Sequence, residues 1–169
     1  MKSDKELKNR ALELLEEREV SIKDIAELVL FLQNPYIKDL TIEECVDSVY
    51  TVLNKREVQN TIITGIEMDK LAEEGKLSQP LNDILMEDEG LYGIDEIMAL
   101  SIVNVYGSIG FTNYGYIDKL KPGIIKTLDR KNKNRCHTFL DDIVGALAAA
   151  AASRIAHADP GKSAITNMN

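Results

Sequence analysis

A long segment near the end of the sequence fits only in the interior of a folded domain. It reads FLDDIVGALAAAAASRIAH, residues 139–157, and is apolar or small on almost every face. With about 100° between successive residues, Leu140 and Leu147 fall on one stripe, and Gly145 and Ser153 on the opposite side. Small residues at every fourth position let another helix approach closely, either within the chain or across a symmetric subunit interface. We therefore expect a buried, Ala-rich helix here.

Helical periodicity recurs along the rest of the chain, whereas period-two alternation of β-branched residues is hard to find. We predict an all-α fold, a single-domain multi-helix bundle. The 169 residues suit one domain that removes roughly 70% of its unfolded surface from water. We assign residues 1–157 to this domain. Residues 158–169 lack apolar periodicity, and we expect them to form a flexible tail.

Capping patterns place several helix boundaries. Thr41 with Glu44, for example, has the arrangement of a capping box. The segment from Asp95 to Tyr106 is apolar on every face, so we expect a central helix there. The stretch from Gly107 to Arg135 holds four glycines, Pro122 and a basic cluster, and is expected to form loops with short helical pieces. The predicted helices are 4–18 after Ser3, about 22–33 after Ser21 and Asp24, about 42–55, a longer one stopping at Gly75, a short one after Pro80, and one capped by Asp95.

Charge and cysteine content exclude several classes of protein. The formal net charge of −8 argues against a general nucleic-acid binder, which needs clustered Lys and Arg. No sequence run approaches 18 apolar residues, and the start MKSDKELKNR lacks the apolar core of a signal peptide. Cys45 and Cys136 stand far apart without a CxxC pattern, so neither zinc nor a disulfide framework is indicated. We expect a cytoplasmic protein.

Two adjacent aspartates open the Ala-rich helix. Thr138 and Asp141 have the arrangement of a capping box, so the helix should begin near Phe139. Asp142 should face a protein wall or a cavity, where a carboxylate costs several kcal/mol unless a cation, donors or protonation compensate. One interpretation is that the pair caps the helix and interacts with its dipole, worth about 0.3–1 kcal/mol each. The other is that it holds Mg²⁺, which uses one or two carboxylates and bridges to substrate phosphate.

The same segment resembles a known family. FLDDIVGALAAA resembles the acidic helix of the phosphatidylglycerophosphatase A family, in particular of its soluble branch, which includes the low-temperature-requirement C proteins. DEIMALSIVNVYGSIGFTNYGYIDKLKPG (95–123) resembles that branch closely, and its GSIG (107–110) resembles a Gly/Ser-rich stretch of the membrane-bound members. The likeness to the soluble branch covers most of residues 40–157. It implies an all-α, oligomeric domain that uses Mg²⁺ to remove the terminal phosphate of phosphatidylglycerophosphate in phospholipid synthesis.

That chemistry needs a metal to polarise the phosphoryl group and donors for charge on the nonbridging oxygens. With the resemblance, it selects Asp141, Asp142 and Glu96 as metal candidates, and Asp142, Glu96 and His137 as catalytic candidates. Each also has a structural interpretation, such as a helix-dipole interaction for Glu96 or a structural role for His137. The candidates for a phosphate-binding loop and the basic residues beside it are Gly107, Ser108, Gly110, Thr112, Asn113, Lys119, Lys121 and Arg135; Asp118 is a further ligand or a salt-bridge partner of the lysines.

Two other functions fit parts of the sequence. Glu13-x-x-Glu16 and Glu44-x-x-Asp47 place acidic pairs one turn apart on successive predicted helices, which resembles the Mg²⁺ site of all-α nucleoside triphosphate pyrophosphohydrolases of the MazG type. A non-catalytic oligomeric module would use the small-residue helix as an interface and the aspartates as caps. The expected partners are a phosphorylated lipid or small phosphomonoester and copies of the chain, as a dimer or tetramer, with no nucleic acid and at most peripheral contact at the inner membrane face.

Overall fold

The computed structural model describes residues 3–130 and 133–158, and within these ranges every regular element is a helix. The all-α prediction is therefore confirmed. The proposed tail lies outside the described residues from position 159 onward, and Ala158 still belongs to the last helix. The elements are α1 (Asp4–Glu17), α2 (Ile22–Gln33), α3 (Ile42–Leu53), α4 (Arg56–Glu73), α5 (Leu81–Glu87), α6 (Ile94–Val103), the 3-10 turn η1 (Asn104–Tyr106), α7 (Gly107–Leu120), α8 (Gly123–Leu128) and α9 (Leu140–Ala158).

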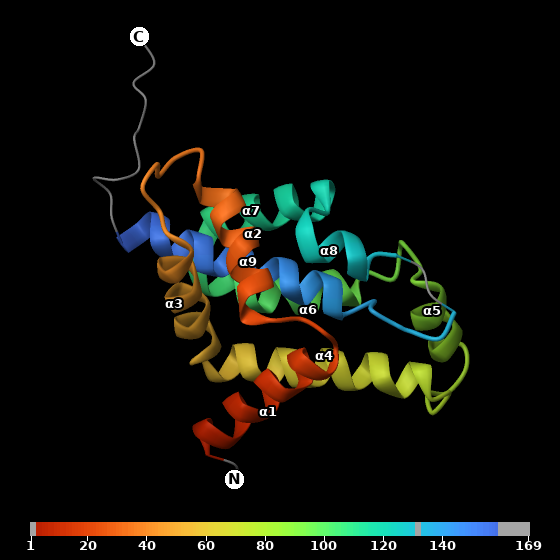
Figure 1. Ribbon diagram of the computed structural model, residues 1–169. Helices are drawn as coiled ribbons and strands as arrows, with labels where there is room; N and C mark the ends of the chain where they lie inside the picture. The colour runs from red at the N-terminus through yellow and green to blue at the C-terminus, as the bar shows by residue number, and fades with distance from the viewer. Residues whose placement is uncertain (1–2, 131–132, 159–169) are drawn as a thin grey trace.

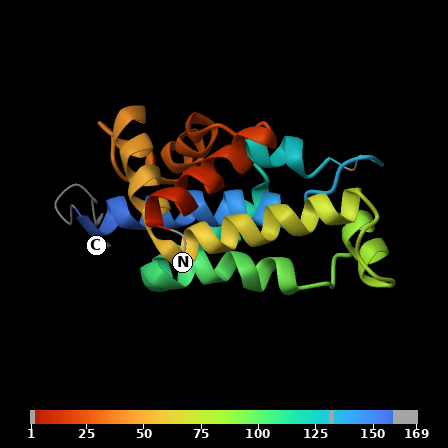
Figure 2. The same ribbon diagram turned by 90° about the horizontal axis from the view of Figure 1, so that it is seen from below.

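Helix α9 lies at the centre of the bundle, surrounded by helices from the whole chain (Figure 1). Every residue from Leu140 to Ser153 is buried. Seen from below in Figure 2, α9 runs between α2 and α3 on one side and α6 on the other, and it contacts all three. The expected buried, Ala-rich helix is thus confirmed, because side chains as small as alanine let several helices approach one axis at once.

Helix α7 packs along α9 in the opposite direction. Near the start of α7, a Cβ on Gly110 would stand 3.6 Å from the Ser153 hydroxyl; further along, a Cβ on Gly145 would stand 3.3 Å from Ile117 Cγ2. The small residues of α9 therefore serve helix crossings within the chain. Because Ala149 and Ser153 are fully buried in the single chain, this stripe is not available as a subunit interface.

The predicted capping residues at the start of the chain are confirmed. Ser3, Ser21 and Thr41 each form a capping box at the helix that follows. At α2, the Ser21 hydroxyl accepts the N–H of Asp24 at 3.1 Å, and the Asp24 carboxylate accepts the N–H of Ser21 at 2.8 Å. Gly75 follows the end of α4 with φ of +62°, as expected of a residue that stops a helix in the left-handed region.

The prediction of loops with short helical pieces between Gly107 and Arg135 was wrong for the first half of this stretch, which forms the 14-residue helix α7. Glycine disfavours a helix by roughly 1 kcal/mol relative to alanine. Here, however, Gly110 permits a close approach: a Cβ at this position would stand 2.9 Å from Val103 Cγ1. Packing against the centre of the bundle therefore outweighs the local preference.

Helix α6 is not central, contrary to the sequence-based expectation. Ile94 and Ile97 are 52% and 63% exposed, because α6 packs on α4 and α9 with one face and leaves the other uncovered. It also begins at Ile94, after Gly93, without a side-chain cap from Asp95. By length and composition alone, the stretch from Ile94 to Leu120 would suffice to cross a membrane, and 22% of its most apolar window is buried.

Candidate active site

Both aspartates lie in the first turn of α9, inside the protein. Asp141 is 8% and Asp142 7% exposed. Oδ1 of Asp141 accepts the backbone N–H of Asp142 at 2.9 Å, so the pair does provide an acceptor for one N–H group in the first turn of the helix. A surface cap would do the same without burial, however, and two adjacent buried carboxylates need further compensation.

Lys121 supplies a positive charge to this cluster. It ends α7 in a left-handed conformation, with φ of 47°, which is uncommon for a residue other than glycine. Its Nζ lies 3.0 Å from Asp141 Oδ2, 3.0 Å from Asp118 Oδ1 and 3.4 Å from Asp129 Oδ1. Burial alone would lower the pKa of Lys121, but Asp141 and Asp118 raise it above its ordinary value. Three elements of the fold thus converge on one ammonium group.

The surroundings of the acidic pair shift the pKa of both carboxyl groups. Burial raises the pKa of Asp141 and of Asp142, and the charge of Asp141 raises that of Asp142 further, while the Tyr114 hydroxyl favours the charged form of Asp142. A buried oxygen nearby, Oδ1 of Asp95, makes no hydrogen bond within the described part of the chain. Perturbed carboxylates beside an unpartnered polar atom are typical of functional sites.

The start of α9 is capped from another helix. Asp69 of α4 is fully buried, and its two oxygens accept the backbone N–H groups of residues 139–140 at 3.1 and 3.0 Å. The predicted capping box of Thr138 and Asp141 is wrong, because the Asp141 N–H donates to the carbonyl of His137 at 3.1 Å, and the Thr138 hydroxyl donates to the carbonyl of Leu85 at 2.7 Å. A carboxylate 70 positions earlier in the sequence therefore fixes where the acidic pair begins.

Asp69 should make the stability of the protein depend on pH. Burial raises its pKa to about 8, whereas an aspartate in an unfolded chain ionises near pH 4. Between these values the folded state holds the proton that the unfolded state has lost, so the contribution of Asp69 to the free energy of unfolding falls as pH rises from about 4 to about 8. The free energy of unfolding, measured by urea denaturation across this pH range, should decrease less steeply with pH for Asp69→Asn than for the wild type. Equal slopes would contradict the raised pKa of Asp69.

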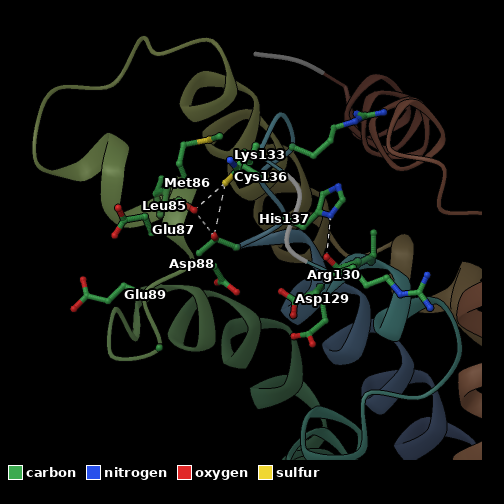
Figure 3. A pocket seen from close by; sticks show the side chains of 15 residues that line it. Leu85, Met86, Glu87, Asp88, Glu89, Asp129, Arg130, Lys133, Cys136 and His137 are labelled. Carbon is green, nitrogen blue, oxygen red and sulfur yellow. Dashed lines mark hydrogen bonds between the residues drawn. The ribbon is translucent and has the colours of Figure 1, made fainter.

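A cleft of about 670 Å³ opens beside the acidic pair, between the end of α5 and the segment joining α8 to α9, with Asp141 in its lining. Figure 3 shows Asp88 and Asp129 directed toward the middle of the pocket, whereas Glu87 and Glu89 point away from it. Basic side chains line the same cleft: Arg130, Lys133 and Arg135. Carboxylates at the centre with cations around them suit a ligand that combines a metal ion with a phosphate.

His137 lies in the wall of this cleft. Its Nδ1 is 3.0 Å from the carbonyl oxygen of Leu128, and burial lowers the pKa of the ring. A carbonyl can only accept, so in the neutral ring Nδ1 carries the proton and Nε2 keeps its lone pair. In this state His137 is prepared to accept a proton rather than to donate one.

The side chains of the other residues singled out from the sequence form no hydrogen bond or ion pair with the acidic pair within the described part of the chain. Glu96 is on the exposed side of α6, and its neighbour Asp95 has the buried oxygen. Asn113 donates to the Ser153 hydroxyl at 3.3 Å; Ser153 is eleven residues beyond Asp142 on α9, about 16 Å along its axis. The remaining candidates are the exposed Ser108, Thr112 and Lys119 on α7, and Arg135, which lines the cleft and lies 3.9 Å from Glu19.

The donor chemistry of the site suits Mg²⁺, although the side chains do not form a finished metal cage. Among residues 3–130 and 133–158, no three His, Cys, Asp or Glu side chains come together closely enough to hold a metal ion. Lys121 provides the cationic partner of Asp141 in this arrangement. Asp141, Asp142 and the unpartnered oxygen of Asp95 are hard oxygen donors of the kind that Mg²⁺ prefers.

The acidic pairs of the pyrophosphohydrolase hypothesis do not converge. Glu13, Glu16, Glu44 and Asp47 are all exposed. Glu16 lines a groove beside α1, whereas Glu44 and Asp47 line a separate one near the end of α9. The Glu44 carboxylate also accepts the N–H of Thr41 at 2.9 Å as part of its capping box. These four carboxylates therefore belong to the outer surface of different helices.

Sequence reasoning missed Asp69, Asp95 and the basic side of the cleft. Asp69 stands three residues after Ile66, on the apolar face of its helix, and an acid in that position was the available signal. Arg130 and Lys133 were visible only as part of a basic cluster. No local pattern indicated that this cluster would face Asp141.

Comparison with known proteins identifies relatives over most of the chain. The sequence model of the family described as Phosphatidylglycerophosphatase A matches residues 21–157. The uncharacterized protein YutG of Bacillus subtilis is 64% identical over 90% of this chain and 92% of its own length. The uncharacterized protein MJ1330 of Methanocaldococcus jannaschii is 30% identical over 77% and 97%. The crystal structure of low temperature requirement C protein from Listeria monocytogenes has a TM-score of 0.89 and 62% identity, covering 90% of this chain and 96% of that one. The chain belongs to the phosphatidylglycerophosphatase A family.

Proposed function

We propose that this protein is a Mg²⁺-dependent phosphatase that removes the terminal phosphate of phosphatidylglycerophosphate. The observation that supports it best is the burial of two adjacent aspartates, Asp141 and Asp142, of which Asp141 lines a cleft with basic side chains. Phosphate monoesters carry two negative charges near neutral pH, so their hydrolysis needs cations around the phosphate and oxygen ligands for a metal. Family membership supports the same class of reaction.

Each side chain of the site has a role in this proposal. Asp141 and Asp142 would hold Mg²⁺ together with water molecules, since this ion typically uses one or two carboxylates. When bound, it would polarise the phosphoryl group and lower the pKa of water. Lys121 lies 3.0 Å from Asp141 and balances part of the negative charge of the carboxylates. Arg130 and Lys133 orient the phosphate from the rim of the cleft. His137 accepts a proton at Nε2, because Nδ1 is committed to a backbone carbonyl.

The direct test is phosphate release from phosphatidylglycerophosphate in detergent micelles. We expect release in MgCl₂ and none after addition of EDTA. Glycerol 3-phosphate and a nucleoside triphosphate serve as competing substrates: faster release from the former would indicate a soluble phosphomonoester, and pyrophosphate from the latter would indicate the pyrophosphohydrolase. Absence of phosphate release by folded protein under all of these conditions would refute the proposal.

Reversing the charges of the cleft should weaken substrate binding. Replacing both Arg130 and Lys133 with glutamate is expected to raise KM at least tenfold with a smaller effect on kcat, because each charged hydrogen bond to phosphate is worth about 1.5–3 kcal/mol. Lys126→Glu is the matched control, since Lys126 is exposed on α8 and does not contribute to the lining. The same rise in KM for the control would attribute the effect to net charge rather than to the cleft.

A further inference from the structure

Asp69 joins α4 to the segment that carries the acidic pair. Besides the two N–H groups at the start of α9, its Oδ1 lies 3.4 Å from the sulfur of Cys136. The segment 136–140 that it contacts contributes Cys136, His137 and Thr138 to the wall of the cleft and then begins α9. One fully buried side chain therefore holds both the wall and the first helical turn.

A second set of bonds fixes the same segment from the other side. Arg18 donates to both oxygens of Glu73, at 2.6 and 3.0 Å, and also to the carbonyl of Cys136. Oε1 of Glu73 in turn accepts the backbone N–H of Cys136 at 2.8 Å. Cys136, four residues before the start of α9, is thus held through both of its backbone polar groups. Glu73 lies one helical turn after Asp69 on α4.

This arrangement exceeds what a helix cap requires. A Ser, Thr or Asn at the cap position would satisfy a first-turn N–H from within the segment itself. Asp69 instead accepts two successive N–H groups with two oxygens, at 3.1 and 3.0 Å, from a helix that is itself packed in the bundle. Two contacts from a fixed element determine both the position and the rotation of the first turn, and Asp141 and Asp142 follow directly in that turn. Displacements near 1 Å can cost about 100-fold in rate.

We infer that Asp69 is a positioning residue, which holds the first turn of α9 so that Asp141 at the cleft and the adjacent Asp142 keep one fixed orientation. This inference rests on the proposed phosphatase function for its kinetic consequence, although the positioning itself can be measured without activity. Asp69 does not touch the substrate, because it is enclosed behind the backbone of the segment 136–140 and has no exposed surface.

The test compares Asp69→Ala and Asp69→Asn with the wild type. Hydrogen exchange, measured without metal or substrate, should be at least tenfold faster at residues 139–142 in Asp69→Ala, while residues 148–152 keep their protection. Asparagine retains one acceptor oxygen, so Asp69→Asn should lie between the two. The expected kinetic result is a fall in kcat of at least tenfold for alanine, and less for asparagine, with KM changed by less than about threefold.

The matched control is Gln59→Leu, which removes another buried side-chain bond from the same helix. Gln59 is 1% exposed and donates to the carbonyl of Leu53 at 2.9 Å, and it lies ten residues before Asp69, about 15 Å along α4. A purely structural role for Asp69 predicts that exchange accelerates equally at 139–142 and 148–152, and this result, or an unchanged kcat in both variants of Asp69, would overturn the inference. If the wild type releases no phosphate, the proposed function fails, and the exchange pattern still decides whether Asp69 holds the turn.

Discussion

Replacing Asp142 with asparagine is expected to reduce phosphate release by about 10³-fold or more. Asparagine keeps the size of the side chain but cannot carry the charge that binds a metal ion, and losing several kcal/mol of transition-state stabilisation corresponds to this factor. The fold should survive, because burial and the charge of Asp141 already disfavour the ionised form of Asp142, so a neutral amide removes a repulsion. The measurement is the rate of phosphate release from phosphatidylglycerophosphate at saturating MgCl₂, together with a urea denaturation curve.

Asp47→Asn is the control for this variant. Asp47 is an exposed aspartate on α3 and belongs to the acidic pattern of the alternative pyrophosphohydrolase. Full activity in Asp47→Asn and almost none in Asp142→Asn would locate the chemistry at the start of α9. If Asp142→Asn retains more than about a tenth of the wild-type rate, the acidic pair is not the centre of the reaction.

Among the proposed substitutions, Arg18→Met should cause the largest loss of stability. The Arg18 side chain is 3% exposed and that of Glu73 17%, and Arg18 also satisfies the carbonyl of Cys136. Methionine fills similar space but leaves a mostly buried carboxylate and a buried carbonyl without their donor. Removing one partner of a buried ion pair costs about 3–5 kcal/mol, which for a chain of this size lowers Tm by roughly 10 °C. Differential scanning calorimetry measures this shift.

Arg10→Met provides the comparison on the surface. Arg10 lies within 3.5 Å of Glu13 and 3.0 Å of Glu17 and Glu67, but its side chain is 39% exposed. Ion pairs in solvent contribute about 0–1 kcal/mol, so the shift in Tm should be a few degrees at most. A similar decrease of Tm in both variants would show that burial does not increase the contribution of the Arg18–Glu73 ion pair to stability.

The parts of the fold that the sequence predicts well depend on interactions between near neighbours. The capping box of Ser21 and Asp24 involves residues three positions apart, and the burial of α9 follows from the absence of any polar face. In both cases the relevant physical interactions are contained in a few consecutive residues. A single sequence is sufficient for such features.

The predictions that failed depend on which distant segments meet. Thr138 has the pattern of a cap, but Asp69, far away in the sequence, takes that role in space. Glu96 and Asp95 are adjacent, and only the rotation of α6, about 100° per residue, decides which of them has a buried oxygen. Gly110 would weaken an isolated helix, yet the same missing side chain allows α7 to pack closely beside Val103.

The central position of α9 has a consequence for how the protein is made. The helices that surround it, α2, α3, α4, α6 and α7, are all synthesised before it. Until the ribosome has released residues 140–153, these earlier helices cannot bury the apolar surface that packs on α9, and this surface remains exposed to aggregation and to chaperones. Completion of the native structure is therefore delayed until α9 has been synthesised.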